Sequence, residues 1–200
     1  RKRDFWKWIY CYRSSRKIYF LSQVIMLKIA LTGGIGTGKT YISKQFIEMG
    51  IPVYYADDEA KKLYQEDFVL DFFRINFGEA IFDNEKLNFA KLSQEIFSDT
   101  EKLSQVNAFI HPLVMERFNL WAKQQKTSVV IMESAIVFEG KLTSFFDKIW
   151  VVNAPLEVRI SRIQKRNPNL TLEEIKSRIA NQISQEEKCK AADLVIDNSY

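Results

Sequence analysis

The eight residues from Gly33 to Thr40, GGIGTGKT, fit the spacing G-x-x-x-x-G-K-[ST]. Glycines let a backbone wrap around phosphate oxygens so that successive N–H groups point inward. In such a loop the ammonium of Lys39 can meet the β- and γ-phosphates, and the hydroxyl of Thr40 can ligate Mg²⁺. The spacing therefore predicts a phosphate loop that binds ATP and Mg²⁺. We place nine residues in the nucleotide site: Gly33, Gly34, Ile35, Gly36, Thr37, Gly38, Lys39, Thr40 and Tyr41.

The residues on either side of the loop predict the elements that would hold it. The apolar run Leu27–Thr32 predicts a strand before the loop, and the spacing of apolar residues from Tyr41 to Met49 predicts a helix after it. Four further short apolar runs are Pro52–Tyr55, Ser128–Met132, Lys148–Asn153 and Leu194–Ile196. Because longer stretches with room for helices separate these runs, we expect a parallel sheet covered on both faces.

Residues 57–125 contain helical patterns and no convincing strand. The clearest pattern runs from Leu103 to Trp121, and it predicts a helical subdomain inserted into the α/β body. A later helix is expected to begin after Thr171, because Glu174 follows three residues on, at the spacing of a capping box.

The composition, with 46% hydrophobic residues in 200, predicts one domain with a substantial core. The net charge of +4 is concentrated in residues 1–25, where seven Lys or Arg face Asp4 alone, so the remaining residues are slightly acidic. This basic and aromatic segment could lie on an anionic membrane or a nucleic acid. We favour a second interpretation, an extension without a role ahead of a natural start at Met26. Residues 26–200 are then expected to contact neither nucleic acid nor membrane.

The two cysteines, Cys11 and Cys189, are too few for a disulfide framework and have no partner at metal-ligand spacing. No apolar run reaches the roughly 18 residues needed to cross a bilayer. Both observations favour a reducing, cytoplasmic location, and we expect a monomer.

The phosphate loop alone does not define the reaction, because GTPases, motors, helicases and kinases all use it. A GTPase would need an Asp-x-x-Gly and an Asn/Thr-Lys-x-Asp, and neither is present in this sequence. Helicase and motor cores generally need more residues than follow this loop. A small-molecule kinase therefore remains.

Eight segments of the sequence resemble the dephospho-CoA kinase family in order and spacing, and together they cover nearly all of residues 26–200. They are ALTGGIGTGKT, ADDEAKKL, FG, HPLV, ESAIVFE, WVVNAP, RIQKRN and ADLVIDN. The resemblance implies a three-layer P-loop kinase fold with a five-stranded parallel sheet, a helical substrate-binding insert over roughly 57–125, and a short lid over roughly 159–175. It also implies transfer of the γ-phosphoryl of ATP to the ribose 3′-hydroxyl of dephospho-CoA, the last step of coenzyme A biosynthesis. A further helix is implied after Tyr200.

The resemblance implies roles for three charged residues in the transfer. Asp57 is expected to accept or orient the proton of the hydroxyl, although an Asp after a strand is also a common helix N-cap. Arg162 is expected to be the catalytic arginine of the lid, and Arg166 a second candidate that binds the nucleotide. Without the resemblance, two arginines four residues apart usually form a solvated helix face.

Three other residues complete the candidate site. Glu133 follows an apolar run, where P-loop proteins place the carboxylate that holds the Mg²⁺ water shell, although the family more often has Asp there. His111, the only histidine, and Lys61 are candidates for binding the substrate. Each also has a plain interpretation, as a structural histidine and a solvated lysine.

Two other functions stay open from the sequence alone. One is a kinase of the same fold that acts on a nucleotide or another metabolite. The other is a nucleotide-dependent regulatory protein whose basic arm contacts RNA or membrane, with binding that weakens steeply as salt rises.

Overall fold

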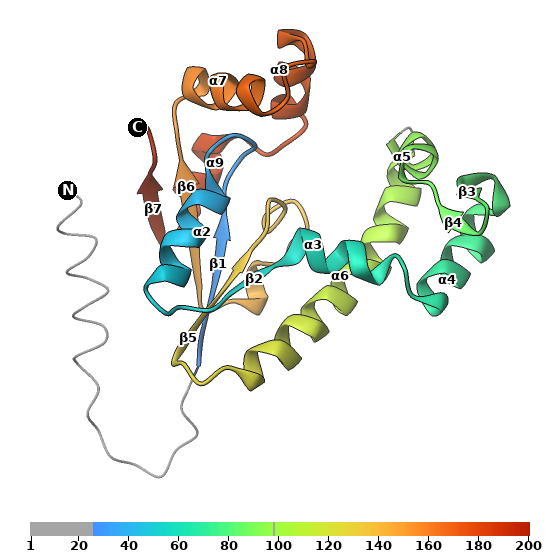
Figure 1. Cartoon of the computed structure of the whole chain (residues 1–200), viewed down its shortest axis with the longest axis horizontal. Coiled ribbons are helices and arrows are strands. Elements are labelled where there is room, and N and C mark those ends of the chain that lie inside the picture. The colour runs from blue at the N-terminus through green and yellow to red at the C-terminus, as the bar shows by residue number, and fades with distance from the viewer. Residues whose placement is uncertain (1–25, 98) are drawn as a thin grey trace.

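The computed structural model describes residues 26–97 and 99–200 (Figure 1). The basic and aromatic segment 1–25, for which the sequence left two interpretations open, lies outside the described residues. The described chain forms an α/β body with a group of helices extending from one side of it.

A five-stranded sheet forms the centre of the body, and every neighbouring pair of its strands is parallel. The strands lie in the order β2 (Val53–Tyr55), β5 (Val129–Glu133), β1 (Leu27–Thr32), β6 (Lys148–Asn153) and β7 (Leu194–Asp197). All five strands were predicted from apolar runs in the sequence, and the α/β class with a five-stranded parallel sheet is confirmed.

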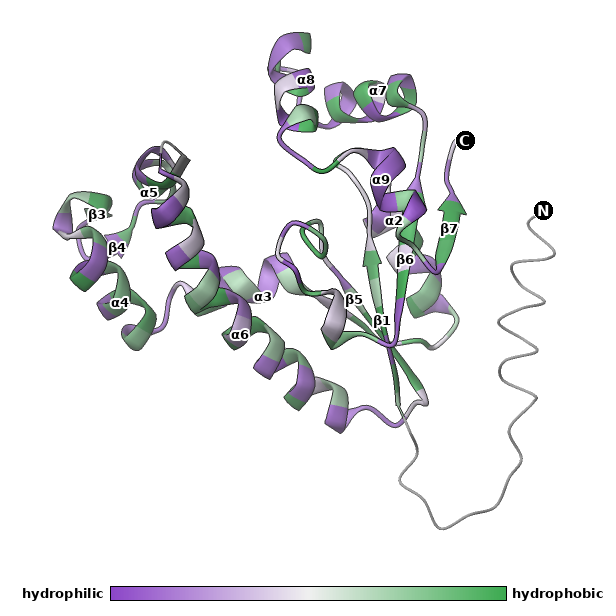
Figure 2. Cartoon of the chain, turned by 180° about the vertical axis from the view of Figure 1, so that it is seen from behind, coloured by the Kyte–Doolittle hydropathy of each residue, from purple (hydrophilic) through white to green (hydrophobic). Residues whose placement is uncertain are grey.

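Both faces of the central strands are buried, which explains why these strands are apolar runs, coloured mostly as hydrophobic in Figure 2. On one face, Ile29 and Leu31 of β1 pack in the same cluster as Phe46 of helix α2 (Lys39–Glu48). Ala30, between them in sequence, belongs to a cluster on the other face. The helix predicted after the phosphate loop is therefore α2, and it covers one face of the sheet.

Four helices lie between β2 and β5, and Figure 1 shows them extending to one side of the sheet. They are α3 (Ala56–Leu63), α4 (Asp67–Phe77), α5 (Phe89–Phe97) and α6 (Thr100–Gln124). One continuous apolar cluster joins Val69 and Phe73 of α4 to Val130 and Met132 of β5. The helices therefore share a core with the sheet.

The expectation of no strand in residues 57–125 was wrong. After the short 3-10 helix η1 (Glu79–Ile81), strands β3 (Phe82–Asp83) and β4 (Lys86–Leu87) pair antiparallel. Asn84 and Glu85 connect them with φ values of 47° and 66°, a turn geometry that matches the twist of a tight hairpin. Two residues per strand are too few to produce an alternating pattern in the sequence.

Helix α6 is 25 residues long and continues through Pro112. The side chain of Asp99 caps its start by accepting from the backbone N–H groups of Glu101 and Lys102. Within the described residues, no helix is long and apolar enough to cross a membrane, α6 included.

The chain after β6 forms three α-helices near the carboxyl end of the sheet (Figure 1). They are α7 (Leu156–Arg166), α8 (Leu172–Ala180) and α9 (Gln185–Lys190). A separate 3-10 helix, η2 (Thr143–Phe145), precedes β6. The capping box predicted at Thr171 and Glu174 is confirmed. A second box, in which Ser184 and Glu187 cap α9, was not predicted.

Candidate active site

The strand register brings three segments to one edge of the sheet. Glu133, the last residue of β5, pairs with Leu31 of β1 on one side and with Tyr55 of β2 on the other. The phosphate loop follows β1, and Asp57 follows β2 as the second residue of α3. Because carboxyl ends of parallel strands meet at one edge, the loop, Asp57 and Glu133 face the same region.

Contacts within the phosphate loop fix its shape. The hydroxyl of Thr37 is buried and donates to the carbonyl of Gly34 at 2.9 Å. The ammonium of Lys39 donates to the carbonyl of Gly33 at 2.9 Å. Lys39 therefore lies over the loop, with its charge inside the turn.

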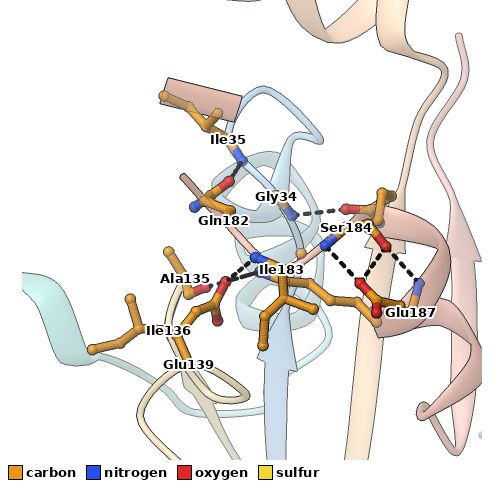
Figure 3. Close-up of polar contacts among 12 residues, drawn as sticks. Gly34, Ile35, Ala135, Ile136, Glu139, Gln182, Ile183, Ser184 and Glu187 are labelled. Atoms are coloured by element: carbon orange, nitrogen blue, oxygen red, sulfur yellow. Dashed lines mark hydrogen bonds and ion pairs between the residues drawn. The ribbon is translucent and has the colours of Figure 1, made fainter. Parts of the chain in front are cut away.

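Two glutamines from the C-terminal segment hold backbone amides of the loop. The side-chain oxygen of Gln185 accepts from the N–H of Gly34 at 2.9 Å, and that of Gln182 accepts from the N–H of Ile35 at 2.8 Å (Figure 3). These two amides are therefore satisfied by protein groups.

Three side chains hold the carbonyls of the loop. The Nε of Arg159 donates to the carbonyl of Ile35 at 2.9 Å, and Arg159 itself is buried. The carbonyl of Thr37 accepts from Asn198 Nδ2 at 2.9 Å and from Arg162 at 3.2 Å. Contacts on both amides and carbonyls thus hold residues 34–37 of the loop.

Gly38 is one of the positions at which the loop requires glycine. Its φ of 91° lies in the left-handed region, and a Cβ there would come within 2.2 Å of Asn198 Nδ2. The close approach of Asn198 therefore depends on the missing side chain.

Opposite charges meet at the open end of the loop. Burial lowers the pKa of Lys39, and the nearby carboxylates Glu133 and Asp57 partly oppose that change. Desolvation likewise raises the pKa of Glu133, which is almost fully buried, and Lys39 opposes this. The three residues interact electrostatically as one group.

Asp57 lies at the mouth of this group. Its side chain keeps contact with solvent, yet desolvation by the surrounding protein raises its pKa, with Lys39 acting in the opposite direction. The N-cap of α3 is Tyr55, so the alternative interpretation of Asp57 as the capping residue does not apply. The carboxylate is therefore available to a bound molecule.

Thr40 and Glu133 form the polar pair closest to a metal-binding arrangement. The hydroxyl of Thr40 donates to Glu133 Oε2 at 3.3 Å. In the described part of the chain, no group of three or more His, Cys, Asp or Glu could hold a metal ion. Mg²⁺ commonly takes only one or two protein ligands and completes its shell with phosphates and water. The pair fits that mode of binding.

The two predicted lid arginines occupy different environments. Besides Thr37, Arg162 donates to the backbone carbonyls of Asn198 at 2.9 Å and Tyr200 at 2.6 Å. It therefore joins the loop to the end of the chain. Arg166 is exposed at the last position of α7, and within residues 26–97 and 99–200 it has no hydrogen bond or ion pair to the loop.

The remaining candidates are Tyr41, Lys61 and His111. Tyr41 is 59% exposed in the first turn of α2, and Lys61 is exposed and paired with Asp58 at 2.9 Å. His111 lines a cavity of about 460 Å³ between α6 and residues 139–145, and burial lowers its pKa. The structure thus brings together Lys39, Thr40, Asp57 and Glu133, with Lys61 acting electrostatically on Asp57 and Arg162 held against the loop at Thr37. It does not bring Arg166, Tyr41 or His111 into this group.

Sequence reasoning missed four residues that contact the loop: Arg159, Gln182, Gln185 and Asn198. The signal for Asn198 was present in the segment ADLVIDN, and that for Arg159 in its position one helical turn before Arg162. Gln182 lies in the turn before α9 and Gln185 is the first residue of that helix, and no local sequence pattern indicated either glutamine.

A parallel α/β sheet with a phosphate loop after its first strand, an acidic residue after its second and a helical insert defines a P-loop kinase. Comparison with known proteins specifies the family: residues 27–200 match the family described as dephospho-CoA kinase. This chain belongs to the dephospho-CoA kinase family, whose members are ATP-dependent kinases.

Curated relatives cover most of the chain. The dephospho-CoA kinase of Bacteroides fragilis is 41% identical over 174 residues, which are 86% of this chain and 84% of that one. The dephospho-CoA kinase of Fusobacterium nucleatum is 36% identical over 86% of this chain and 89% of that one.

Two solved structures are similar in fold. The protein TT1252 from Thermus thermophilus has a TM-score of 0.79 and 30% identity, and the match covers 88% of this chain and 90% of that one. The dephospho-CoA kinase from Campylobacter jejuni has a TM-score of 0.59 and 25% identity, with coverage of 86% and 88%.

Proposed function

We propose that this chain transfers the γ-phosphoryl group of ATP to the ribose 3′-hydroxyl of dephospho-CoA, which gives CoA and ADP. The observation that carries the proposal is the group formed by Lys39, Asp57 and Glu133 at the open end of the phosphate loop. Family membership supplies the acceptor, and this group supplies the charges that the transfer needs.

Asp57 acts on the acceptor hydroxyl. As the 3′-oxygen attacks the γ-phosphorus, the bond to the β–γ bridging oxygen breaks and ADP leaves. The hydroxyl proton passes to the Asp57 carboxylate and then to solvent. The raised pKa of Asp57 makes it a better proton acceptor than an ordinary aspartate.

Lys39 and Arg162 act on the phosphates. The Lys39 ammonium neutralises charge on the β- and γ-phosphates. Arg162, which donates to the carbonyl of Thr37 in the loop, is the proposed catalytic arginine that stabilises charge on the transferred group. Thr40 and Glu133 would hold Mg²⁺, which neutralises phosphate charge when bound. Arg166 would have to move with α7 in order to meet the nucleotide, and we keep it as a candidate for the closed state.

The helices between β2 and β5 form the acceptor side of the site. We propose that residues 57–125 bind dephospho-CoA through the His111 cavity, with Lys61 as a further contact. Residues 159–175, in α7 and α8, would serve as the lid that excludes water during transfer. A monomer in the cytoplasm fits this small-molecule reaction.

ADP release by the full chain with Mg-ATP tests the proposal. We expect dephospho-CoA to stimulate release and nucleoside monophosphates to have no such effect. Stimulation by a nucleoside monophosphate alone would favour another kinase of this fold. Equal release with and without any acceptor, in folded protein that binds ATP, would contradict phosphoryl transfer to a small-molecule hydroxyl.

A further inference from the structure

Lys188 of α9 carries a charge that acts electrostatically on Lys39 but has no assigned role in the proposed chemistry. Its side chain is completely buried, and its ammonium lies 2.6 Å from Glu139 Oε1. A longer contact of 3.4 Å joins it to the carbonyl of Ala135. A buried charge is costly unless it is paired, so this ion pair requires an explanation.

Few hydrogen-bond donors balance the carboxylate of Glu139. Its Oε1 also accepts from the backbone N–H of Ile183 at 3.2 Å, whereas its Oε2 is buried and, among the described residues, has no hydrogen-bond partner (Figure 3). Without Lys188, one backbone amide would remain to balance this carboxylate. The position of Glu139 is therefore tied to residues 183–188.

The same short segment holds the phosphate loop. Gln182 and Gln185 accept from the amides of Ile35 and Gly34, and Gln185 Nε2 also donates to the carbonyl of Val152 at the end of β6. The capping box of Ser184 and Glu187 fixes the start of α9, which lies between Gln182 and Lys188. Residues 182–188, which we call the clamp segment, thus contact the loop through Gln182 and Gln185, and contact Glu139 through Ile183 and Lys188.

Glu139 also lies beside the cavity that we propose binds the acceptor. Glu139 and Gly140 line the cavity that contains His111. A Cβ on Gly140 would come within 3.0 Å of His111 Cε1, so the backbone of residue 140 packs directly against the histidine ring. Displacement of Glu139 would therefore move one wall of that cavity.

We propose that Lys188 is a positioning residue: its buried pair with Glu139 fixes the clamp segment so that the phosphate loop and the His111 cavity are held in one relative geometry. The effect of this pair on acceptor binding rests on the proposed function, whereas its effect on ATP binding by the phosphate loop does not. We therefore expect a change on the Glu139 side to alter ATP binding, and a change on the loop side to alter binding of the acceptor.

Cross-effects in the full chain test this coupling. Glu139→Gln keeps the side-chain volume and lies on the cavity wall, with no contact to the loop. We expect it to weaken Mg-ATP binding, measured by calorimetry, by about ten-fold, which is within the usual range for coupled sites. Conversely, Gln182→Leu should raise the KM for dephospho-CoA by a similar factor. Lys188→Met should produce both effects and lower kcat.

Three controls separate positioning from simple loss of stability. Lys190→Met removes an exposed lysine from the same helix, where it pairs with Glu186, and should leave all constants unchanged. Val69→Ala removes buried volume from the core of α4 and should lower the Tm without altering ATP binding by the folded protein. If Lys188→Met does not fold, Glu139→Gln and Gln182→Leu decide the question.

Unchanged ATP affinity in folded Glu139→Gln, or effects no larger than those of Val69→Ala, would overturn the inference. If the unmodified chain does not turn over dephospho-CoA, the proposed acceptor is wrong, and the ATP affinity of Glu139→Gln and Lys188→Met alone decides whether the pair positions the loop.

Discussion

The carboxylates of Asp57 and Glu133 lie close enough to Lys39 to affect its pKa, and each carboxylate is itself desolvated. Desolvation strengthens every interaction among these charges, and it makes each of them sensitive to loss of a partner. The central question about this site is therefore which protonation state of Asp57 supports transfer.

Asp57→Asn should lower kcat by about 10²- to 10⁴-fold, the usual contribution of a general base. In the unmodified chain, kcat/KM for dephospho-CoA should rise with pH on its acid limb as Asp57 loses its proton. Because desolvation raises the pKa of Asp57, we expect the midpoint of this limb above the ordinary Asp value of about 3.9. A pH–rate profile measures it, and a midpoint at or below the ordinary value would contradict the assignment.

Asp57→Asn should lower activity but raise stability. An Asp whose pKa is raised by folding binds its proton more tightly in the folded state, so its contribution to stability is present below the unfolded pKa and is lost as pH rises through the folded pKa. At neutral pH, Asp57→Asn should therefore raise the Tm slightly, and the gain should vanish in acid. Because Asp57 keeps contact with solvent, we expect the change to be small. Thermal melts at several pH values check this sign.

The sequence predicted the residues proposed to bind phosphate and Mg²⁺ better than the residues that hold the phosphate loop in place. Lys39 and Thr40 follow from the loop spacing, and Glu133 follows from the end of an apolar strand. Arg159 and Asn198 lie in segments that the sequence does mark, but they act on backbone groups 124 and 161 positions away, so no local pattern indicates these contacts. Such contacts become visible only when the fold brings α7 and the end of β7 to the loop.

The phosphate loop is held by surrounding side chains as much as by its own backbone. Gly38→Ala would place a methyl group against Asn198 in addition to forcing a left-handed alanine. We expect a loss of about 1 to 3 kcal/mol of stability from backbone strain and a fall in kcat/KM of about a hundred-fold from the displaced loop.

Gly50→Ala is the matched control for this substitution. Gly50 also has a positive φ, 77°, but a Cβ there meets nothing within 4 Å. It should therefore show the strain without the loss of activity. Comparable kinetic losses in both variants would show that the contact with Asn198 does not shape the loop.

The strands of the sheet were predictable because each appears as a short apolar run, and the central strands β5, β1 and β6 are largely buried. The hairpin of β3 and β4 was not predictable, since each strand has two residues and its turn lies inside a stretch dominated by helices. Length and burial decided which elements could be seen in the sequence.

The insert and the sheet share one apolar cluster, so we expect the whole chain to unfold as a single cooperative unit. Phe118 of α6 is fully buried and its ring contacts those of Tyr54, Trp121 and Phe146. Phe118→Ala should cost about 3 to 5 kcal/mol of the free energy of unfolding, in one transition that includes the sheet. Two separate transitions, with only one shifted, would show that the insert folds independently.

The most direct measurement is transfer of labelled phosphate from [γ-³²P]ATP to dephospho-CoA by the full chain in a single turnover, with Lys39→Met and Asp57→Asn alongside. The proposed function predicts label in CoA, at the 3′-position, with transfer strongly reduced in both variants although circular dichroism shows them folded. Label that stays in ATP or appears as inorganic phosphate, or transfer that persists unchanged in Asp57→Asn, would contradict it.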